Sequence, residues 1–332
     1  MRIEGTFIEE TYAEAFTLRA ARLVITADEE RLARTAATAM TGFAASIIAC
    51  GCEAGLEGPR PAATPDGRPG VRVLAFARDA AVLQDQLVRR VGQCVMTAAT
   101  ASCFDDLPSA ESVRLGSMLR FFGDGLQTSK VIEPSLALAG GEAVRPRRVW
   151  RIPVMDGEFV IDDRCGVVRA VAGGNFLILG TSPRATLAAA ERSVEAIRSI
   201  PGVILPFPGG IVRSGSKVGS KYRALPASTN SPYCPTLRGQ VATALPDEVD
   251  SVLEIVIDGL TREDVGAAMA AGIRAACGPG VARISAGNYG GRLGKHLFPL
   301  RPLLDPAADP ATGGPATGPA GDGPAAAGPG GR

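Results

Sequence analysis

The feature that most constrains the fold is an internal repeat. A glycine-rich segment, PGVILPFPGGIVRSGSK, spans residues 201–217, and a second, PGVARISAGNYGGRLGK, spans residues 279–295, 78 positions further on. The preceding runs FLIL (176–179) and EIVI (254–257) keep the same offset. Each copy reads as strand, helix, PGV turn, strand and glycine loop. We therefore expect a duplicated β-α-β unit in the C-terminal half of the chain.

Both glycine loops end in a lysine, and both are rich in backbone donors. Glycine lets a ligand approach backbone amides closely, although a single loop of this kind is explained equally well by chain reversal between strands. Two copies favour a binding site, and a branched side chain at Gly210 should then weaken ligand binding more than folding. The candidate ligand-facing residues are Gly209, Gly210, Ser214, Ser216 and Lys217 in the first copy and Asn288 and Tyr289 in the second.

Known cofactor motifs fit the chain poorly. In the segment from Gly210 to Lys217, Ser216 stands between the last glycine and the lysine, and Val218 replaces the hydroxyl residue that a triphosphate-binding loop requires. The only histidine, His296, adjoins Lys295 and suggests a solvated surface residue. Seven cysteines without a CxxC pair indicate neither a zinc site nor a disulfide framework. We expect no metal, no tightly bound cofactor and a reducing, cytoplasmic setting.

Charge and hydropathy exclude other classes. The 35 Lys and Arg residues balance 34 Asp and Glu residues, so no electrostatic footprint for nucleic acid is visible. No signal peptide is expected at the N-terminus, and the uncharged run over residues 35–52 carries too many Thr, Ser and Gly residues for a membrane span. Residues 305–332 hold 6 Pro and 8 Gly and nothing apolar larger than Ala, which predicts a disordered tail.

The N-terminal half reads as alternating strands and helices. We expect a strand at 22–26, a helix opened by a capping box at Thr26 and Glu29, strands at 46–51 and 71–77, a helix from Asp79 to Gln93, and a strand at 117–122. This order is the split βαβ, or ferredoxin-like, arrangement. An Asp156-Gly157 hairpin then opens the second half. We expect an α+β protein of two ferredoxin-like lobes, residues 1–148 and 149–304, followed by the tail.

One carboxylate occupies an unusual position. In SVLEIVIDG the strand alternation places Glu254 among apolar residues on either face. Burial would raise its pKa, and a carboxyl group kept protonated near neutral pH can donate a proton to a reacting group. A glutamate on a solvated strand face, or one paired with an arginine, is the alternative.

Several blocks resemble the formylmethanofuran:tetrahydromethanopterin formyltransferase family. The resemblance runs from about residue 3 to residue 300 and departs in the tail and over residues 220–233. The blocks that carry it are TPDGRPG (64–70), GQCV (92–95), RFFGDG (120–125), VAGGNF (171–176), PFPGGIV (206–212), SGSKVG (214–219), CPTL (234–237), EIVIDG (254–259) and AGNYGG (286–291).

The resemblance implies a homotetrameric enzyme that moves a formyl group between N5 of tetrahydromethanopterin and the amine of methanofuran, with both coenzymes as co-substrates. Related bacterial proteins act in formaldehyde oxidation to formate, within a formyltransferase/hydrolase complex. The resemblance also places the family's proposed acid on Glu254. A non-catalytic pterin-binding or structural subunit of such a complex remains the alternative, because fold alone does not give function.

Overall fold

The computed structural model describes residues 1–132, 147–213, 215 and 217–305. The predicted tail lies outside the described residues except for Asp305, and so do Ser214 and Ser216. In the described part, no helix is long and apolar enough to cross a membrane.

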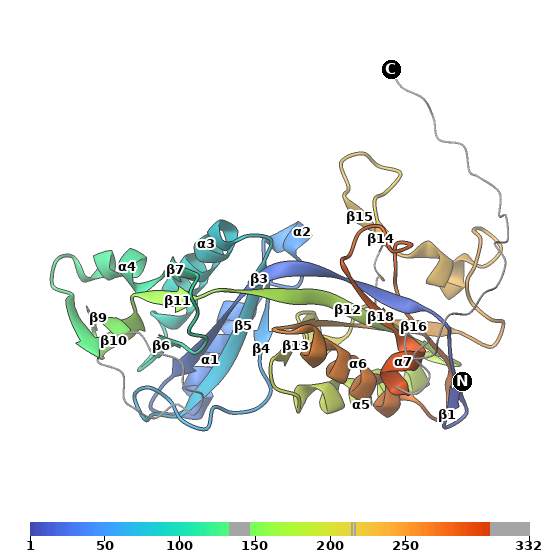
Figure 1. Ribbon diagram of the computed structural model, residues 1–332, viewed down its shortest axis with the longest axis horizontal. Coiled ribbons are helices and arrows are strands. Elements are labelled where there is room, and N and C mark those ends of the chain that lie inside the picture. The colour runs from blue at the N-terminus through green and yellow to red at the C-terminus, as the bar shows by residue number, and fades with distance from the viewer. Residues whose placement is uncertain (133–146, 214, 216, 306–332) are drawn as a thin grey trace, which may run out of the picture.

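Two long antiparallel strands run through the middle of the molecule (Figure 1). They are β3 (Tyr12–Thr26) and β12 (Val168–Gly180), and they pair from Ala20 opposite Val168 to Phe16 opposite Ala172. Each strand is much longer than a typical strand of five or six residues. Because both extend beyond their shared segment, they join two sets of strands into one large mixed sheet.

The N-terminal set of elements encloses the first core, an apolar cluster that includes Leu23, Ile25, Leu83 and Phe159. Its main elements are α1 (Glu30–Thr41), β4 (Glu53–Leu56), β5 (Gly70–Ala77), α3 (Ala80–Arg90), β6 (Ser102–Asp105), β8 (Thr128–Ile132), β9 (Arg147–Val154) and β10 (Gly157–Asp162).

The C-terminal set encloses the second core, an apolar cluster that includes Phe176, Ile257, Ile273 and Phe298. Its main elements are β1 (Arg2–Ile3), β2 (Thr6–Ile8), α5 (Pro183–Arg198), β13 (Val203–Ile204), β16 (Ser251–Gly259), α6 (Arg262–Ala276), β17 (Val281–Ser285), β18 (His296–Pro299) and α7 (Leu300–Leu304).

Short elements complete the described chain. They are α2 (Ile47–Cys50), η1 (Val91–Val95), β7 (Ser112–Arg114), α4 (Gly116–Leu119), η2 (Arg120–Gly123), β11 (Arg164–Gly166), η3 (Pro208–Gly210), β14 (Lys217–Val218), β15 (Ala227–Ser228), η4 (Ser231–Tyr233) and η5 (Pro235–Leu237).

The predicted repeat is confirmed as two β-α-β units, β12-α5-β13 and β16-α6-β17. Ser182 caps α5 through the Ala185 N–H, and Thr261 and Asp264 form a reciprocal capping box at the start of α6. Helices α5 and α6 cover one face of the β12–β16 pair, where the second core lies. The opposite face, which includes Leu177 and Leu179, packs against the loop residues Leu245 and Val249.

Several local predictions in the N-terminal half hold. The strand at 71–77 is β5, and Asp79 caps α3 by accepting the Val82 N–H at 2.8 Å. The Asp156-Gly157 turn connects β9 and β10. This hairpin pairs with β6 and packs in the first core, however, so it does not open the C-terminal set of elements.

Three N-terminal predictions are wrong. Residues 46–51 form the short helix α2, because Ser46 caps it and Gly51 ends it at a φ of 78°. Residues 117–122 are helical turns in α4 and η2, and β6 supplies the strand expected there. Thr26 is the last residue of β3 and donates its hydroxyl to Asp66, so it caps no helix.

Two buried carboxyl groups meet where the two cores adjoin. Glu53 of β4 and Asp258 of β16 interact directly, and Asp258 also accepts the Gly173 N–H at 2.9 Å. Burial, and then the neighbouring Glu53 carboxylate, raise the pKa of Asp258 well above its ordinary value. Burial also raises the pKa of Glu53. Two neighbouring carboxylates repel each other, so the folded pair releases its last proton at a higher pH than unfolded carboxyl groups do.

This pair should make stability fall as pH rises. Unfolded carboxyl groups release their protons near pH 4, whereas the folded pair keeps one until its raised pKa. Its contribution to the free energy of unfolding is therefore full below about pH 4 and is lost above it, by up to about 1.4 kcal/mol per pH unit. Asp258→Asn, which keeps the acceptor for Gly173, should remove this dependence. Urea unfolding should show that the free energy of unfolding of the variant, relative to that of the native protein, is higher at pH 8 than at pH 5.

The matched control is Asp247→Asn, which removes an exposed carboxylate from a surface loop. Its pH profile should run parallel to that of the native protein. Parallel profiles for Asp258→Asn as well would mean that the buried pair holds no extra proton.

Candidate functional site

Glu254 lies on the loop-covered face of β16 and is 1% exposed. Its strand partner on β12 is Leu177, and on its other side it exchanges two backbone hydrogen bonds of 2.8 Å with Val212. Val212 lies within the first glycine loop, so this bridge fixes that part of the loop against the strand. The burial expected for Glu254 is confirmed, while its role as an acid stays a prediction.

A small cavity opens beside Glu254. Its volume is about 20 Å³, which is room for roughly one water molecule. The lining combines a carboxylate, a phenol, a thiol, an amide and a guanidinium group over an apolar floor. The residues are Leu177, Val212, Arg213, Gly215, Asn230, Tyr233, Cys234, Val252, Leu253 and Glu254.

Sequence reasoning missed Asn230, Tyr233 and Cys234 as site residues. They come from a segment that lies outside both repeats and has no regular hydrophobic periodicity. The short turns η4 and η5 bring them over Glu254. The CPTL block was the only signal in this region, and nothing in those four residues points to chemistry. Their phenol, thiol and amide groups can donate hydrogen bonds to a polar ligand beside the carboxylate.

The first glycine loop divides into a structural and an exposed part. Gly210 is buried with a φ of 84°, donates its N–H to the Phe207 carbonyl, and leaves room for no side chain because an added Cβ would lie 2.9 Å from Leu205. Gly209 is exposed with a φ of 68°, and a Cβ there would meet nothing within 4 Å. The packing therefore predicts that substitution of Gly210 costs stability, contrary to the expectation from the sequence.

The second glycine loop closes around an internal anion. The buried carboxylate of Glu14, on β3, accepts backbone N–H groups from Tyr289 (2.7 Å), Gly291 (3.0 Å), Leu293 (2.5 Å) and Gly294 (2.6 Å). Burial acts to raise the pKa of Glu14, but these four hydrogen bonds lower it, and the net shift is downward. These amides are thus engaged within the protein and do not point at a ligand.

The structure brings together only part of the predicted site. Val212 and Gly215 of the first loop lie beside Glu254. Lys217 is exposed in the β14–β15 hairpin, outside the cavity lining. Asn288 donates to Thr11 and to the Tyr12 carbonyl, and the Tyr289 ring lies 6.3 Å from that of Phe16. The second loop leaves β17 just after Ser285, which is separated from Glu254 by Leu177 of β12, about 10 Å across the sheet.

The described residues do not include a cluster of side chains suited to bind a metal ion. No group of three or more His, Cys, Asp or Glu side chains among those residues could hold an ion. The described cysteines are free, and Cys234 is the one that lines the cavity.

Family models match nearly all of the folded chain. The model described as "Formylmethanofuran-tetrahydromethanopterin formyltransferase" matches residues 1–154, and the model described as "FTR, proximal lobe" matches residues 157–303.

Curated relatives align over almost their whole length. The formylmethanofuran–tetrahydromethanopterin formyltransferase of Methylococcus capsulatus is 56% identical over 92% of this chain and 100% of its own. A protein of Methylorubrum extorquens that is named as a component of the formyltransferase/hydrolase complex is 49% identical over 92% of this chain and 98% of its own.

Solved structures agree with these matches. The crystal structure of the formyltransferase/hydrolase complex from Methylorubrum extorquens with methylofuran contains a chain that superposes with a TM-score of 0.87 at 47% identity, covering 92% of this chain and 99% of that one. The enzyme from Methanosarcina barkeri superposes with a TM-score of 0.83 at 46% identity, covering 91% of this chain and 100% of that one. The chain therefore belongs to the formylmethanofuran-tetrahydromethanopterin formyltransferase family.

Proposed function

We propose that this protein is a formyltransferase that moves a formyl group between N5 of tetrahydromethanopterin and the amine of methanofuran. The observation that carries the proposal is Glu254, a buried carboxyl group beside a polar cavity, in a chain that matches the family over its folded length. Both coenzymes act as co-substrates, and the proposed chemistry uses no tightly bound cofactor.

Transfer between two nitrogens requires proton management. The neutral amine of methanofuran attacks the formyl carbon, and the carbonyl oxygen gains negative charge in a tetrahedral adduct. The adduct collapses as the bond from carbon to N5 breaks, and N5 takes a proton from Glu254. The attacking nitrogen then releases a proton that restores the Glu254 acid. The Tyr233 phenol and the Asn230 amide, which line the same cavity, supply hydrogen bonds to the developing oxyanion.

Substrate entry requires the cavity to widen, because about 20 Å³ cannot hold a pterin and a furan. The wall that would have to move is the segment that carries Tyr233, because Val212 is held against β16. We propose that Gly209 and Lys217 contact substrate at its rim, with Ser214 and Ser216 between them, while Gly210 shapes the loop. Asn288 and Tyr289 extend the substrate surface from the second loop.

The biological setting is proposed by similarity. A relative named as a component of the complex, and a structural neighbour solved within that complex, support assembly with other subunits. We propose that the reaction serves formaldehyde oxidation to formate and that the chain works in the cytoplasm as a homotetramer. We also propose two ferredoxin-like lobes, predicted as residues 1–148 and 149–304, with the β9–β10 hairpin packed in the first of them. A non-catalytic pterin-binding or structural subunit is the competing function.

Glu254→Gln should abolish most of the transfer rate. Glutamine keeps the size of the side chain and one hydrogen-bond donor but cannot release a proton. Loss of a positioned acid costs about two to four orders of magnitude in rate. Single-turnover transfer, with coenzyme binding measured separately by calorimetry, should show a large fall in rate at nearly unchanged affinity.

Two further variants sharpen this test. Glu248→Gln removes an exposed glutamate and should leave the rate unchanged. Glu254→Asp keeps an acid on a shorter side chain and should recover part of the rate. A Glu254→Gln enzyme within about threefold of the native rate would limit the proton transfer to under about 1 kcal/mol and sink the assignment. Binding of the pterin without turnover by the native protein would favour the competing function.

The two neighbouring glycines should respond differently to substitution. Gly210→Val adds a branched side chain at a positive φ against Leu205 and Val194, and should destabilise the fold by about 2 to 5 kcal/mol. Gly209→Ala meets open space, so it should cost only about 1 to 2 kcal/mol and weaken coenzyme binding more than stability. Thermal melts paired with calorimetric titrations measure both effects. Equal responses from the two variants would contradict this division of roles.

Self-association should be measurable in solution. The uncharged stretch at 91–104 buries Val91, Val95 and Phe104 within the chain itself, so these side chains are not available for contact between subunits. Exposed apolar side chains lie instead at Phe121 (65%), Phe122 (60%) and Leu126 (77%), and clusters of this kind mark association surfaces. Light scattering at micromolar concentration should give a mass well above the 34.1 kDa monomer. A monomer mass would rule out the homotetramer.

A further inference from the structure

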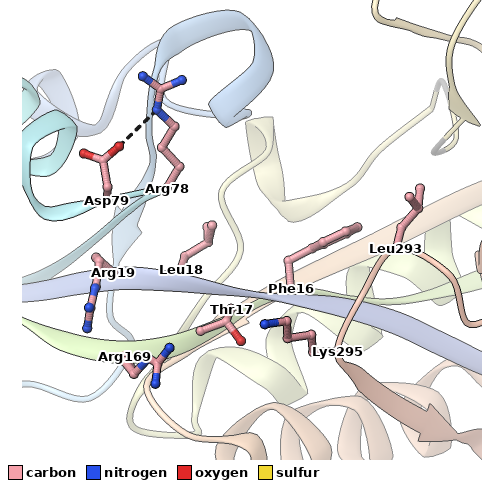
Figure 2. A pocket seen from close by; sticks show the side chains of 9 residues that line it. All are labelled: Phe16, Thr17, Leu18, Arg19, Arg78, Asp79, Arg169, Leu293 and Lys295. Carbon is pink, nitrogen blue, oxygen red and sulfur yellow. Dashed lines mark hydrogen bonds and ion pairs between the residues drawn. The ribbon is translucent and has the colours of Figure 1, made fainter.

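A second pocket, larger than the cavity at Glu254, lies over the segment where β3 and β12 pair. Its volume is about 410 Å³. Figure 2 shows its lining side chains, which come from β3, β12, the start of α3 and the end of the second glycine loop. They are Phe16, Thr17, Leu18, Arg19, Arg78, Asp79, Arg169, Leu293 and Lys295.

The lining is strongly cationic. The lining holds four basic side chains and one acid, Asp79, which is already engaged by the Val82 N–H and by Arg78. Arg19 pairs with Glu111 at 3.0 Å. Among the described residues, no carboxylate lies within 4 Å of the charged group of Arg169 or Lys295.

Strand register places two of these cations side by side. Arg19 and Arg169 are direct partners in the β3–β12 pairing. Like charges opposite one another in a sheet destabilise the pairing unless a counter-charge lies between them. Of these two arginines, Arg19 has a carboxylate partner among the described residues and Arg169 has none. An anion in the pocket would therefore relieve the repulsion at Arg169.

The backbone holds Lys295 in place from both sides. Gly294 lies against β3, where an added Cβ would approach the Ala15 carbonyl oxygen to 2.5 Å, and His296 pairs with Ala15 at the start of β18. The same loop is closed around Glu14 by its four hydrogen bonds. Lys295 thus leaves a fixed backbone and extends towards Thr17 (Figure 2). Glu14 therefore acts as a positioning residue for Lys295.

We propose that this pocket binds a multiply charged anionic group, a phosphate or a cluster of carboxylates, with Arg169 and Lys295 as its main cationic contacts. Guanidinium groups match the planar geometry of such anions, and lysine adds a point charge. The Thr17 hydroxyl, which is 2.9 Å from the His296 ring nitrogen, supplies a polar contact between them.

The pocket is separate from the cavity at Glu254. Arg169 and Leu177, the strand partner of Glu254, lie eight residues apart on β12, a path of roughly 25 Å along a strand. The inference does not rest on formyl transfer, because the binding is measurable with neither coenzyme present.

Calorimetric titration of the full-length protein with pyrophosphate and with citrate tests the proposal. Both titrations are run at matched low ionic strength. We expect one-site binding of at least one probe, weakened by added salt. Preference for pyrophosphate would indicate a phosphate ligand, and preference for citrate a carboxylate ligand. Absence of binding by both probes up to about 10 mM would overturn the proposal.

Variants locate the binding. Arg169→Gln with Lys295→Gln should weaken binding about tenfold or more, since both remove charge-assisted contacts from exposed side chains whose loss spares the fold. Arg184→Gln removes an exposed arginine from the first turn of α5 and should bind like the native protein. Unchanged binding in the double variant, or an equal loss in Arg184→Gln, would refute the site.

Glu14→Gln separates loop positioning from simple electrostatics. Removal of a negative charge near a cationic pocket should strengthen anion binding if charge alone matters. Loss of the carboxylate that holds the loop should instead weaken it, because Lys295 then loses its fixed place. We expect weaker binding, and tighter binding would contradict the positioning role of Glu14.

Discussion

The antiparallel pairing of β3 with β12 is the constraint on which the rest of the structure depends. The two strands share only the segment from Phe16 to Ala20, and each then continues into a different set of partners. A single sheet therefore serves both cores. The second core takes Ala13 and Ala15 from β3, and a smaller apolar cluster joins β3 and β12 where they pair. Helices cover the sheet on both sides of the segment where β3 and β12 pair. At that segment itself, arginines and the end of the second glycine loop line a pocket.

The two copies of the repeat share one local pattern, but their glycine loops have different contacts. Both copies build the same strand, helix and turn, with Gly202 and Gly280 at positive φ after the two helices. Beyond the turn the copies diverge, because their neighbours differ. The first loop bridges to Glu254 through Val212, and the second closes around Glu14 of β3. The glycines permit both paths, but the first loop is held by backbone hydrogen bonds to the β16 strand at Glu254, whereas the second is held by the Glu14 carboxylate.

The sequence predicted what local chemistry decides. The start of a helix at Asp79 and the Asp156-Gly157 turn depend on a few neighbouring residues, and both appear in the structure. Residues 46–51 were misread because the Ile-Ile pair favours a strand, although Ser46 and Gly51 were already the two caps of a short helix. The full length of β3, the closure of a loop around Glu14 and the fold of Tyr233 over Glu254 all depend on contacts between distant segments. No periodicity in the chain carries that information.

The buried carboxylates differ in what satisfies them, and this difference separates structural from chemical roles. Glu14 is held by four backbone N–H groups, which stabilise its ionised form. Glu57 is held by an ion pair with Arg22 and by the Gly202 N–H, and the latter hydrogen bond ties it to the C-terminal half. Asp258 and Glu53 interact with each other, and burial together with this contact raises the pKa of Asp258. Each of these arrangements is closed, and a ligand could enter it only by breaking contacts that the fold needs. Glu254 differs because it lines a cavity whose other walls come from a loop and short turns. Of these carboxyl groups, Glu254 is the one that lines such a cavity, and this is why the acid of the proposed transfer is assigned to it.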